Sequence, residues 1–556
     1  MTPQKWQICS PLPSTSLSSY SDVSPLLVQL LHNRGISDPT QFELFFTADE
    51  RLAGDPFLLP DMDEAVTRVL RALLDDETIA IYGDFDADGI TATVILYQAL
   101  TALGGRVISY IPHRVNEGHG LNRTALKHLK EQGATLVITV DCGVTGISEV
   151  EEGQEMGLDI VITDHHPPFA LLPPALAIIC PKRPDSSYPF GELAGVGVAF
   201  KLVQALFQAT NNDQRCDVFL DLVALGTVAD MVPLVGENRY LVKRGLEILN
   251  CSQRLGLQEM VLCAGLELGS INSGSISYTL GPRLNASGRL DHAAISYELL
   301  TTTSAEQAHS LAIRIEAVNV ERQRLTSTIL AKAKEQLGDT TQPLLMVGDA
   351  DYIPGVLGVV ANKLVDEFYR PAIVFQMDNE VIRGSGRSIP EFDLLAALNK
   401  CSDLFTRFGG HARAAGFTIP RVNMEQLRKR LLEIAAPLSD ADLCPTLFID
   451  VELPLSEVSG GIYKLINKLE PFGQANPVPT LLSRRVKLIN SRFIGDNGKH
   501  LKLKLHDGSV VWDAIVFNHN EQQLSPYLDI VYNLETEIWG GRELLRLNII
   551  NFAPAS

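Results

Sequence analysis

Three acidic residues alternate within one short segment, GDFDADG at residues 83–89. In an extended loop, alternate side chains point to the same side, so Asp84, Asp86 and Asp88 can face one cation together. An EF-hand calcium loop shares the spacing but requires a bidentate Glu where this chain has Ile95, and it follows a helix instead of an apolar strand. The segment therefore indicates a divalent-cation site of another kind.

Further carboxylates and imidazoles follow later apolar segments. Asp141 follows ATLVITV, the run Asp164, His165 and His166 follows LDIVIT, and Asp230 stands in ADMVPL after a helical stretch. So many carboxylates repel one another unless cations neutralise them. Oxygen ligands with one or two imidazoles favour Mn²⁺ or Mg²⁺ over zinc, and a pair of such ions is suited to phosphate-ester hydrolysis. A single Asp is more often a helix cap or a turn residue, so the prediction depends on the whole set.

Five short apolar runs must position these residues. They are continuous and rich in Ile and Val, as strands buried on both faces are, and helical patterns separate them. Because ligands bind beyond the carboxyl ends of parallel strands, we expect the acidic residues to meet at one edge of a mainly parallel sheet. The predicted strands are residues 78–82, 106–111, 134–140, 158–163 and 175–180.

The rest of the chain divides by pattern. A short helical lead comes first, and a long helix is predicted from about Ser304 to Leu337. A second α/β region follows, with Gly-rich loops at residues 384–388 and 408–416. From about residue 445 the pattern changes to β-hairpins with Asn-Gly and Asp-Gly turns, which predicts a small all-β barrel.

The composition sets limits on the type of protein. Apolar residues make up 46% and charged residues 20% of the 556 residues, as in a soluble globular protein of several domains. No apolar run approaches the roughly 18 residues of a membrane span, and the start lacks a secretory signal. The eight cysteines form no CxxC pair, so we expect buried thiols in the cytoplasm and no cysteine zinc site.

The formal charge of −19 argues against nucleic acid as a ligand, because phosphates attract Lys and Arg. One region has the opposite balance. Seven basic residues and a single acid, Asp496, lie between Arg484 and His506. A local basic surface decides binding more than the total does, so the predicted barrel can bind a nucleic-acid strand. The basic residues are Arg484, Arg485, Lys487, Arg492, Lys499, Lys502 and Lys504.

The motifs in this order resemble the DHH phosphoesterase superfamily and, within it, the RecJ single-strand exonucleases. The resemblance rests on GDFDADG, VDCG (140–143), TDHH (163–166), ADMVPL (229–234), GPRLNASGRLD (281–291), GSGRS (384–388), FGGHARAAGF (408–417) and LEPFGQANPVP (469–479). It implies an α/β fold: a mainly parallel-sheet DHH domain, joined by a long helix to a smaller α/β DHHA1 domain, plus a C-terminal all-β OB-fold. The expected boundaries are 1–74 (helical lead), 75–300 (DHH), 301–342 (connector helix), 343–444 (DHHA1) and 445–556 (OB-fold).

The resemblance also implies a role for each acidic residue. Asp84, Asp86 and Asp141 would hold one Mn²⁺ or Mg²⁺ ion, and Asp88, Asp141, His165 and Asp230 would hold the other, with Asp141 bridging. His166 would face the substrate phosphate and act in catalysis with Asp141 and Asp84. Asp164 would orient its neighbours instead of binding metal.

A second set of residues would bind substrate. Arg forms bidentate pairs with phosphate, and the resemblance implies that Arg114, Ser385 and Arg387 hold the 5′ end of a strand. For any one Arg, an exposed position or an ion pair is the competing interpretation, and for His411 it is a tight turn. The predicted substrate-binding residues are Arg114, Arg283, Asn285, Arg289, Ser385, Arg387 and His411.

The chain departs from the family pattern at a few positions. Tyr352 and Ile353 replace a usual Trp-His, His119 stands where Tyr is usual, and Ala475 where Gly is common. None of these is an expected metal ligand.

The function that follows is a 5′→3′ exonuclease specific for single-stranded DNA, which releases 5′-mononucleotides and acts in DNA repair and recombination. Its expected partners are single-stranded DNA, a single-strand-binding protein and a helicase, and we expect a monomer with no membrane partner. Two alternatives stay open. One is a DHH-type phosphodiesterase on short oligonucleotides or cyclic dinucleotides, or a pyrophosphatase; the other is a non-catalytic nucleic-acid-binding scaffold.

Overall fold

The structure is a computed structural model that describes residues 4–13, 23–495, 498–519, 524–539 and 542–555. The chain forms two compact units. One is residues 48–439, and the other combines residues 1–47 with residues 440–556. Among the described helices, none combines the length and the apolar character that a membrane crossing requires.

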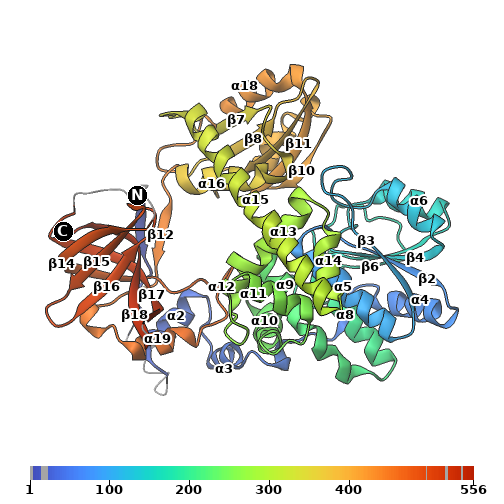
Figure 1. Cartoon of the computed structure of the whole chain (residues 1–556), viewed down its shortest axis with the longest axis horizontal. Helices are drawn as coiled ribbons and strands as arrows, with labels where there is room; N and C mark the ends of the chain where they lie inside the picture. The colour runs from blue at the N-terminus through green and yellow to red at the C-terminus, as the bar shows by residue number, and fades with distance from the viewer. Residues whose placement is uncertain (1–3, 14–22, 496–497, 520–523, 540–541, 556) are drawn as a thin grey trace. The chain divides into compact units, whose positions relative to one another are not determined.

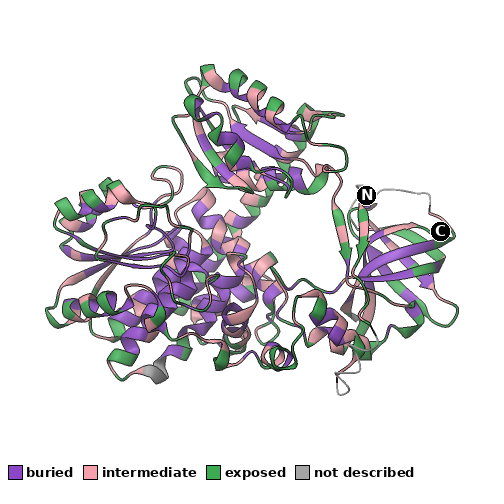
Figure 2. Ribbon diagram, turned by 180° about the vertical axis from the view of Figure 1, so that it is seen from behind, coloured by how far each residue is buried: buried purple, intermediate pink, exposed green. Residues whose placement is uncertain are grey.

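A five-stranded parallel sheet forms the centre of the first half of unit 48–439, as predicted (Figure 1). Its strands stand in the order β3-β2-β4-β5-β6. Side chains alternate between two apolar cores, because Ile79 and Ile81 pack on one face while Ala80 and Tyr82 pack on the other. Burial on both faces explains the continuous apolar runs (Figure 2). The strands are β2 (Thr78–Tyr82), β3 (Arg106–Tyr110), β4 (Ala134–Val140), β5 (Asp159–Thr163) and β6 (Ala177–Ile179).

Helices cover both faces of this sheet. Residues of α4, α5 and α8 share a core with Ile79 and Ile81, and residues of α6 and α7 share the opposite core with Ala80 and Tyr82. A π-helical turn, Ile276–Leu280, precedes α13. The helices are α4 (Met62–Leu74), α5 (Ala87–Ala102), α6 (Arg123–Glu131), α7 (Ile147–Glu155), α8 (Gly195–Ala209), α9 (Leu220–Ala229), α10 (Gly236–Leu249), α11 (Leu255–Cys263), α12 (Ser273–Ser275), α13 (Gly281–Leu290) and α14 (Ala294–Thr301).

The predicted long helix is present as α15 (Ala305–Leu337). Ser304 caps it by accepting a hydrogen bond from the backbone N–H of Gln307 at 3.3 Å. At 1.5 Å per residue it is about 50 Å long, and it packs against both α13 and α16. In Figure 1 it runs from the helices around α13 to the second sheet of the same unit.

The second sheet of this unit corrects one prediction. Both segments that we expected to be Gly-rich loops form strands, and the sheet order is β10-β11-β9-β8-β7. Glycine is used inside β9 because a Cβ atom at Gly384 would lie 2.2 Å from the ring of Phe417, so packing and not a turn requires it. The strands are β7 (Leu345–Asp349), β8 (Ala372–Gln376), β9 (Val381–Arg387), β10 (Arg407–His411) and β11 (Ala414–Pro420), with helices α16 (Pro354–Phe368), α17 (Leu394–Asn399) and α18 (Met424–Ala435).

The other unit contains the predicted barrel. Its sheet runs β14-β15-β16-β18-β17 and closes by pairing β17 with β14. The Asp507–Gly508 turn joins β15 to β16, whereas Asn497 of the predicted Asn-Gly turn lies outside the described residues. The elements are β12 (Thr446–Ile449), β13 (Val451–Glu452), β14 (Leu481–Ile494), β15 (His500–His506), β16 (Val511–Val516), β17 (Tyr527–Trp539), β18 (Arg542–Pro554) and α19 (Gly460–Asn467).

The N-terminal segment packs on this barrel, which the sequence did not indicate. Its elements are β1 (Lys5–Ile8), α2 (Pro25–Asn33) and α3 (Pro39–Thr47). Strand β1 pairs in parallel with β12. Leu30 and Leu31 are fully buried in the same core as Ile466 and Leu481. The first and last parts of the chain therefore share one hydrophobic core.

Candidate metal and phosphate site

The carboxyl ends of three neighbouring strands bring the predicted acidic residues together. Asp84 follows β2, Asp141 follows β4 and Asp164 follows β5, and these strands are adjacent in the sheet. Asp230 completes the group from the C-terminal end of α9. Three sets of residues place their potential ligand atoms within 4.8 Å of one another: Asp84 with Asp86 and Asp141; Asp88 with His165 and Asp230; and Asp141 with His165 and His166.

The backbone holds two of these carboxylates in place. Asp86 is the N-cap of α5, and its Oδ1 accepts hydrogen bonds from the N–H groups of Asp88 and Gly89 at 3.0 and 3.1 Å. Asp88 accepts from the first amides of α8, Gly195 at 2.7 Å and Val196 at 2.8 Å. The helix-cap interpretation of Asp86 is therefore also correct. Each carboxylate keeps further lone pairs for a cation.

Asp141 is held in an uncommon conformation. Its φ of 61° lies in the left-handed region, which a residue other than glycine adopts at a cost of about 1–3 kcal/mol. Gly195 packs directly against it, because a Cβ atom there would lie 2.5 Å from Asp141 Oδ1. The tight packing directs the carboxylate of Asp141 toward the other acids, and backbone strain of this kind is concentrated at functional sites.

The charges at this edge are unbalanced without a cation. Burial and then the neighbouring Asp86 raise the pKa of Asp88 to about 7. Burial and the charge of Asp88 also raise the pKa values of Asp141 and Asp230. Each of these carboxylates is therefore destabilised in its ionised form, and a divalent cation would reverse that effect.

Unpaired polar atoms point to the same conclusion. Asp84 Oδ1, Asp141 Oδ1 and both ring nitrogens of His165 are buried and have no hydrogen-bond partner among the described residues. His165 Nε2 lies 3.1 Å from Asp141 Oδ1 and 3.7 Å from Asp230 Oδ2, without hydrogen-bond geometry to either. Burial and the neighbouring His166 lower the pKa of His165 to about 3, so its ring is neutral, as a metal ligand must be. The residues fit a pair of Mn²⁺ or Mg²⁺ ions.

Asp164 has a different environment from the other acids. Its Oδ1 accepts hydrogen bonds from His166 Nδ1 at 2.7 Å and from the N–H groups of His165 and His166 at 2.7 and 3.0 Å. Its Oδ2 accepts from the N–H of Val144 at 3.0 Å. Burial alone would raise the pKa of Asp164, but the hydrogen bond and charge of His166 lower it to about 2. This arrangement agrees with the expectation that Asp164 orients the two histidines.

Three imidazoles border the acidic group. The His166 ring lies parallel to the His411 ring at 6.2 Å and edge-on to the His119 ring at 5.5 Å. His411 comes from β10 of the second sheet, so both halves of this unit contribute to the site. His119 Nδ1 lies 3.1 Å from Asp84 Oδ1. The family usually has Tyr at the position of His119. This chain therefore places an imidazole beside Asp84, a predicted metal ligand.

Four arginines without acidic partners among the described residues form a group, of which Arg114 and Arg289 interact with Asp86 of the acidic group. Among the described residues, none of Arg114, Arg289, Arg322 and Arg387 has a carboxylate within the 4.0 Å of an ion pair. Burial, and then the charges of Arg114, Arg322 and Arg387, lower the pKa of Arg289 to about 9. Burial and the charge of Arg114 lower the pKa of Arg387 as well. Clustered cations that repel one another form an anion site, and phosphate matches their geometry.

The other predicted substrate-binding residues have varied contacts. Ser385 lies beside Arg387, whose Nη1 is 3.4 Å from Ser385 Oγ. Asn285 Oδ1 accepts from the N–H of Ala87 at 2.8 Å, so it holds the start of α5. Arg283 forms a bidentate pair with Glu316 of α15, at 2.6 and 3.2 Å. The structure thus brings Arg114, Arg289, Ser385, Arg387 and His411 to the site and ties Arg283 to the connector helix.

Arg322 of α15 is the residue that sequence reasoning missed. A lone arginine in a long polar helix carries no local signal of a site. The signal becomes visible only when α13, α15 and the second sheet are brought together, because that packing places Arg322 within electrostatic reach of Arg289.

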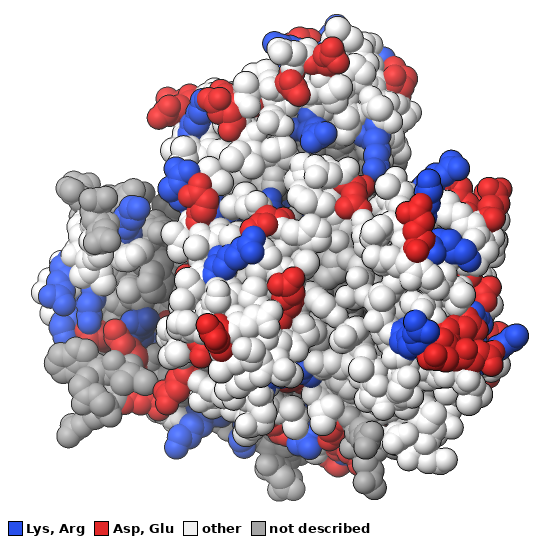
Figure 3. Space-filling model, turned by 45° about the vertical axis from the view of Figure 1, so that its right-hand side comes forward, with Lys and Arg blue, Asp and Glu red and all other residues white. Residues whose placement is uncertain are grey.

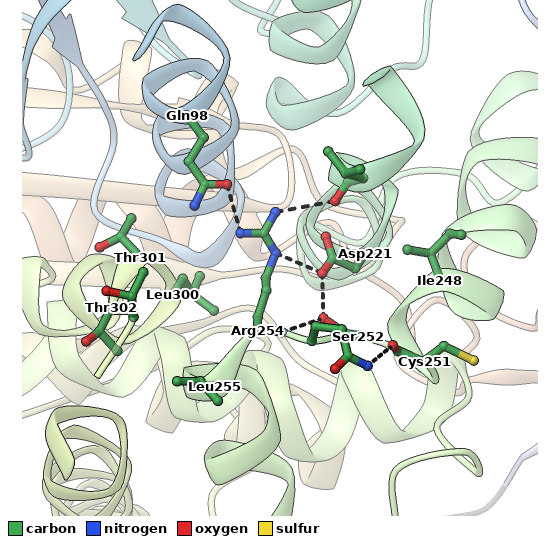
Figure 4. A pocket seen from close by; sticks show the side chains of 13 residues that line it. Gln98, Asp221, Ile248, Cys251, Ser252, Arg254, Leu255, Leu300, Thr301 and Thr302 are labelled. Carbon is green, nitrogen blue, oxygen red and sulfur yellow. Dashed lines mark hydrogen bonds and ion pairs between the residues drawn. The ribbon is translucent and has the colours of Figure 1, made fainter. Parts of the chain in front are cut away.

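A separate charged group anchors the far ends of the helices that carry Asp88 and Asp230. Asp221, at the start of α9, accepts from Arg254 Nε and Ser252 Oγ, both at 2.8 Å. Arg254 Nη1 also donates to Gln98 of α5 at 2.8 Å. These residues line a cavity of about 750 Å³, where Figure 4 shows the Arg254 side chain bridging the two helices. Because its polar groups bind one another, we assign the cavity a supporting role.

The barrel carries the predicted basic residues on its surface. Arg485, Lys487, Arg492 and Lys499 are exposed, and Arg492 stands directly opposite Lys502 in the pairing of β14 with β15. Of the three candidate stacking residues, Phe493 and Phe517 are 39% and 42% exposed, whereas Trp512 is buried in the barrel core. Trp512 is therefore unavailable for stacking in this conformation.

The formal charge of −19 is not gathered into one acidic surface on the face that Figure 3 presents. Basic and acidic side chains are interspersed there in small groups across the described residues. Part of the negative charge lies instead in the buried carboxylates, including Asp84, Asp88, Asp141 and Asp164.

Comparison with family models divides the chain into three matched regions. Residues 78–227 match the DHH family, N-terminal domain; residues 341–436 match the DHHA1 domain; and residues 449–551 match the RecJ OB domain. These matches correspond to the parallel sheet, the second sheet and the barrel, and they confirm the predicted fold class.

Curated relatives match nearly the whole chain. The single-stranded-DNA-specific exonuclease RecJ of Bacillus subtilis (strain 168) is 39% identical, over 98% of this chain and 70% of the relative. Proteins of the same name from Dickeya dadantii (strain 3937) and Escherichia coli (strain K12) are 33% and 30% identical. The alignments cover 97% of this chain and 98% of the relative for D. dadantii, and 96% of each chain for E. coli.

Solved structures match as well. RecJ of Thermus thermophilus in complex with Mn²⁺ is 28% identical with a TM-score of 0.87, covering 99% of this chain and 80% of that chain. The complex of the same protein with Mg²⁺ is 26% identical with a TM-score of 0.81, covering 99% of this chain and 79% of that chain. Both metals that the donor set favours are thus present in structures of a similar protein.

Proposed function

The chain belongs to the RecJ family, and from this membership we propose that it is a metal-dependent exonuclease that degrades single-stranded DNA from the 5′ end and releases 5′-mononucleotides. The observation that carries the proposal is the convergence, in one unit, of the six predicted metal ligands and four arginines for which the described residues offer no acidic partner. A phosphodiester strand is the substrate that needs both groups at once. Its bridging phosphate requires cations for hydrolysis, and its neighbouring phosphates require arginine.

Each predicted ligand has a place in this proposal. Asp84, Asp86 and Asp141 would hold one ion, and Asp88, Asp141, His165 and Asp230 would hold the other. When bound, Mn²⁺ or Mg²⁺ supplies positive charge that stabilises the phosphoryl group and activates water for hydrolysis. The chain itself excludes solvent from the ligands, since Asp84, Asp88, Asp141 and His165 are buried.

The remaining residues position the strand. His166 would face the phosphate that is cut, because Asp164 holds its Nδ1 and leaves Nε2 free to donate a proton or a hydrogen bond. Arg114, Ser385 and Arg387 would hold the 5′ end, and Arg289 would add its charge to theirs. Their charge favours a terminal phosphate over an internal one, which gives the 5′→3′ polarity a physical basis.

The barrel would bind the strand beyond the site. Its exposed basic residues attract phosphates, and Phe493 and Phe517 can stack on bases, as in other OB-folds. The division into a lead (1–74), DHH domain (75–300), connector (301–342), DHHA1 domain (343–444) and OB-fold (445–556) remains our proposal for the domain boundaries.

Cellular context follows from the same proposal. An enzyme restricted to single strands acts where a helicase exposes them or a single-strand-binding protein keeps them open, in repair and recombination. We also propose that it works as a monomer in the cytoplasm. Eight free cysteines, with no disulfide among the described residues, are compatible with a reducing compartment.

The test is an assay of the whole chain on DNA labelled at either end, single-stranded or duplex, with Mn²⁺, Mg²⁺ or a chelator. We expect mononucleotides from the 5′ end of single strands with either metal and none with the chelator. Release from the 3′ end, equal digestion of duplex, or activity confined to dinucleotides would contradict the proposal.

A further inference from the structure

Arg322 stands out among the basic residues of α15 because no carboxylate of the described residues forms an ion pair with it. Its Nη2 donates to Asn319 Oδ1 at 2.9 Å, one turn earlier in the helix. Its Nε is buried and has no hydrogen-bond partner among the described residues. A guanidinium in this state is costly unless a ligand completes its hydrogen bonds.

The neighbouring helix residues show the contrast. Arg324 is exposed and forms two hydrogen bonds of 2.7 Å with Glu321. Arg283 of α13 is paired bidentately with Glu316. Arg322 has only Asn319, which is itself 1% exposed and cannot neutralise charge. Glutamates of α15 thus neutralise Arg283 and Arg324, whereas Arg322 has no counter-charge among the described residues.

Arg322 is also a member of the arginine group described above. Arg289 feels the charges of Arg114, Arg322 and Arg387, and both Arg289 and Arg114 interact with Asp86 of the acidic group. The charge that acts on Arg322 comes instead from Arg283. Arg322 is therefore linked to the arginine group through Arg289, and α15, which carries it, packs against α13.

We propose that Arg322, oriented by Asn319, binds an internucleotide phosphate of the DNA strand that lies beyond the bond being cut. This inference rests on the proposed function and adds a contact on the connector helix. Arg322 would then favour longer strands. A dinucleotide ends before it reaches Arg322, whereas a longer strand gains a bidentate phosphate contact. Asn319 is a positioning residue that keeps the guanidinium plane directed at the strand.

The binding test uses the full chain with a chelator, so that no strand is cut. Arg322→Gln removes the charge with little change in size, and Arg324→Gln is the matched control on the same helix. The probes are a 5′-phosphorylated, 3′-labelled strand of about 15 nucleotides, a length within the site sizes of OB-folds, and a 5′-phosphorylated dinucleotide. Fluorescence anisotropy over a salt series gives the Kd for the strand and its salt dependence, and competition gives the Kd for the dinucleotide.

For Arg322→Gln we expect the strand Kd to rise about tenfold and the salt slope to fall by about one, with the dinucleotide Kd unchanged. Arg324→Gln should match the wild type on both probes. An Arg322→Gln variant that also matches the wild type on the strand would overturn the proposal. An equal loss on the dinucleotide would overturn the placement of the phosphate beyond the cut bond.

A second variant separates position from charge. Asn319→Ala keeps the Arg322 charge but frees the side chain, so the strand Kd should rise while the salt slope stays near that of the wild type. Both readouts are independent of hydrolysis. The end-label assay tests the proposed function, and its failure there would show as a lack of exonuclease activity. The Kd values of the Arg322 and Asn319 variants test the phosphate contact independently.

Discussion

Asp164 and His166 are joined twice, because Asp164 Oδ1 accepts from both the backbone N–H and the Nδ1 of His166, at 3.0 and 2.7 Å. Asp164→Asn keeps an oxygen at this position and removes its charge. We expect kcat to fall about 10–100-fold, because His166 loses the partner that fixes its orientation and its proton. Steady-state kinetics on labelled strands would measure this.

A control for this variant lies at the other end of the same strand. Asp159→Asn removes an exposed carboxylate that pairs with Arg68 and should leave kcat unchanged. Equal kcat values for Asp164→Asn and the wild type would show that the hydrogen bond serves the fold alone.

Asp141 is shared by two of the three candidate ligand sets, so its removal should abolish metal-dependent hydrolysis. In Asp141→Ala we expect the Mn²⁺-induced rise in Tm to disappear. The metal-free Tm should change little, because the loss of charge repulsion among the buried acids offsets the cost of placing Ala in the left-handed conformation. Calorimetric titration and thermal melts would test this, and retained Mn²⁺-dependent activity would reject the bridging role.

The raised pKa of Asp88, about 7, predicts how pH acts on the metal-free protein. A carboxyl whose folded-state pKa exceeds its unfolded value, about 3.9, binds its proton more tightly when folded. Stability should therefore decrease as pH rises from about 4 to 7 and then level off. Over the same window, the stabilisation by Mn²⁺ should increase, because the metal replaces the proton.

Urea denaturation at pH 5 and pH 8, with and without Mn²⁺, would measure both effects. Asp88→Asn should reduce the pH dependence of the metal-free protein, and the remainder comes from Asp141 and Asp230, whose pKa values are also raised. Asp164, whose pKa is lowered to about 2, titrates below this window and should not contribute to it. Metal-free stability that rises between pH 5 and pH 7 would contradict the prediction.

The Arg254 anchor predicts a loss of stability away from the active site. Arg254→Ala leaves the buried Asp221 without its partner, which should lower the free energy of unfolding by about 3–5 kcal/mol. Arg244→Ala, which breaks an exposed pair with Glu247, should cost at most about 1 kcal/mol. Urea denaturation of both variants would compare them, and equal losses would show that the Asp221 pair adds nothing.

The parallel sheet and the meeting of Asp84, Asp141 and His165 could be predicted because both depend on local patterns. Apolar runs buried on two faces identify the strands, and parallel strands bring their carboxyl ends to one edge. Sequence patterns alone do not show which backbone amides bind a carboxylate. The N–H groups of Gly195 and Val196, more than a hundred positions away, donate to Asp88.

Other features were hidden because they depend on contacts between distant segments. Glycines at 384 and 416 suggested loops, yet β9 and β11 use them inside a sheet, and at Gly384 the ring of Phe417 needs the space. Likewise, Leu30 and Leu31 give an ordinary amphipathic helix, and nothing local indicates that its partner is the barrel at the other end of the chain.

The pairing of β1 with β12 makes residues 48–439 an insertion within the fold formed by the two ends of the chain. The nuclease body is consequently tethered to the strand-binding barrel by two covalent connections. A single proteolytic nick at either connection would leave the two parts linked. During synthesis, moreover, α2 must wait for its barrel partners until the last strands have left the ribosome.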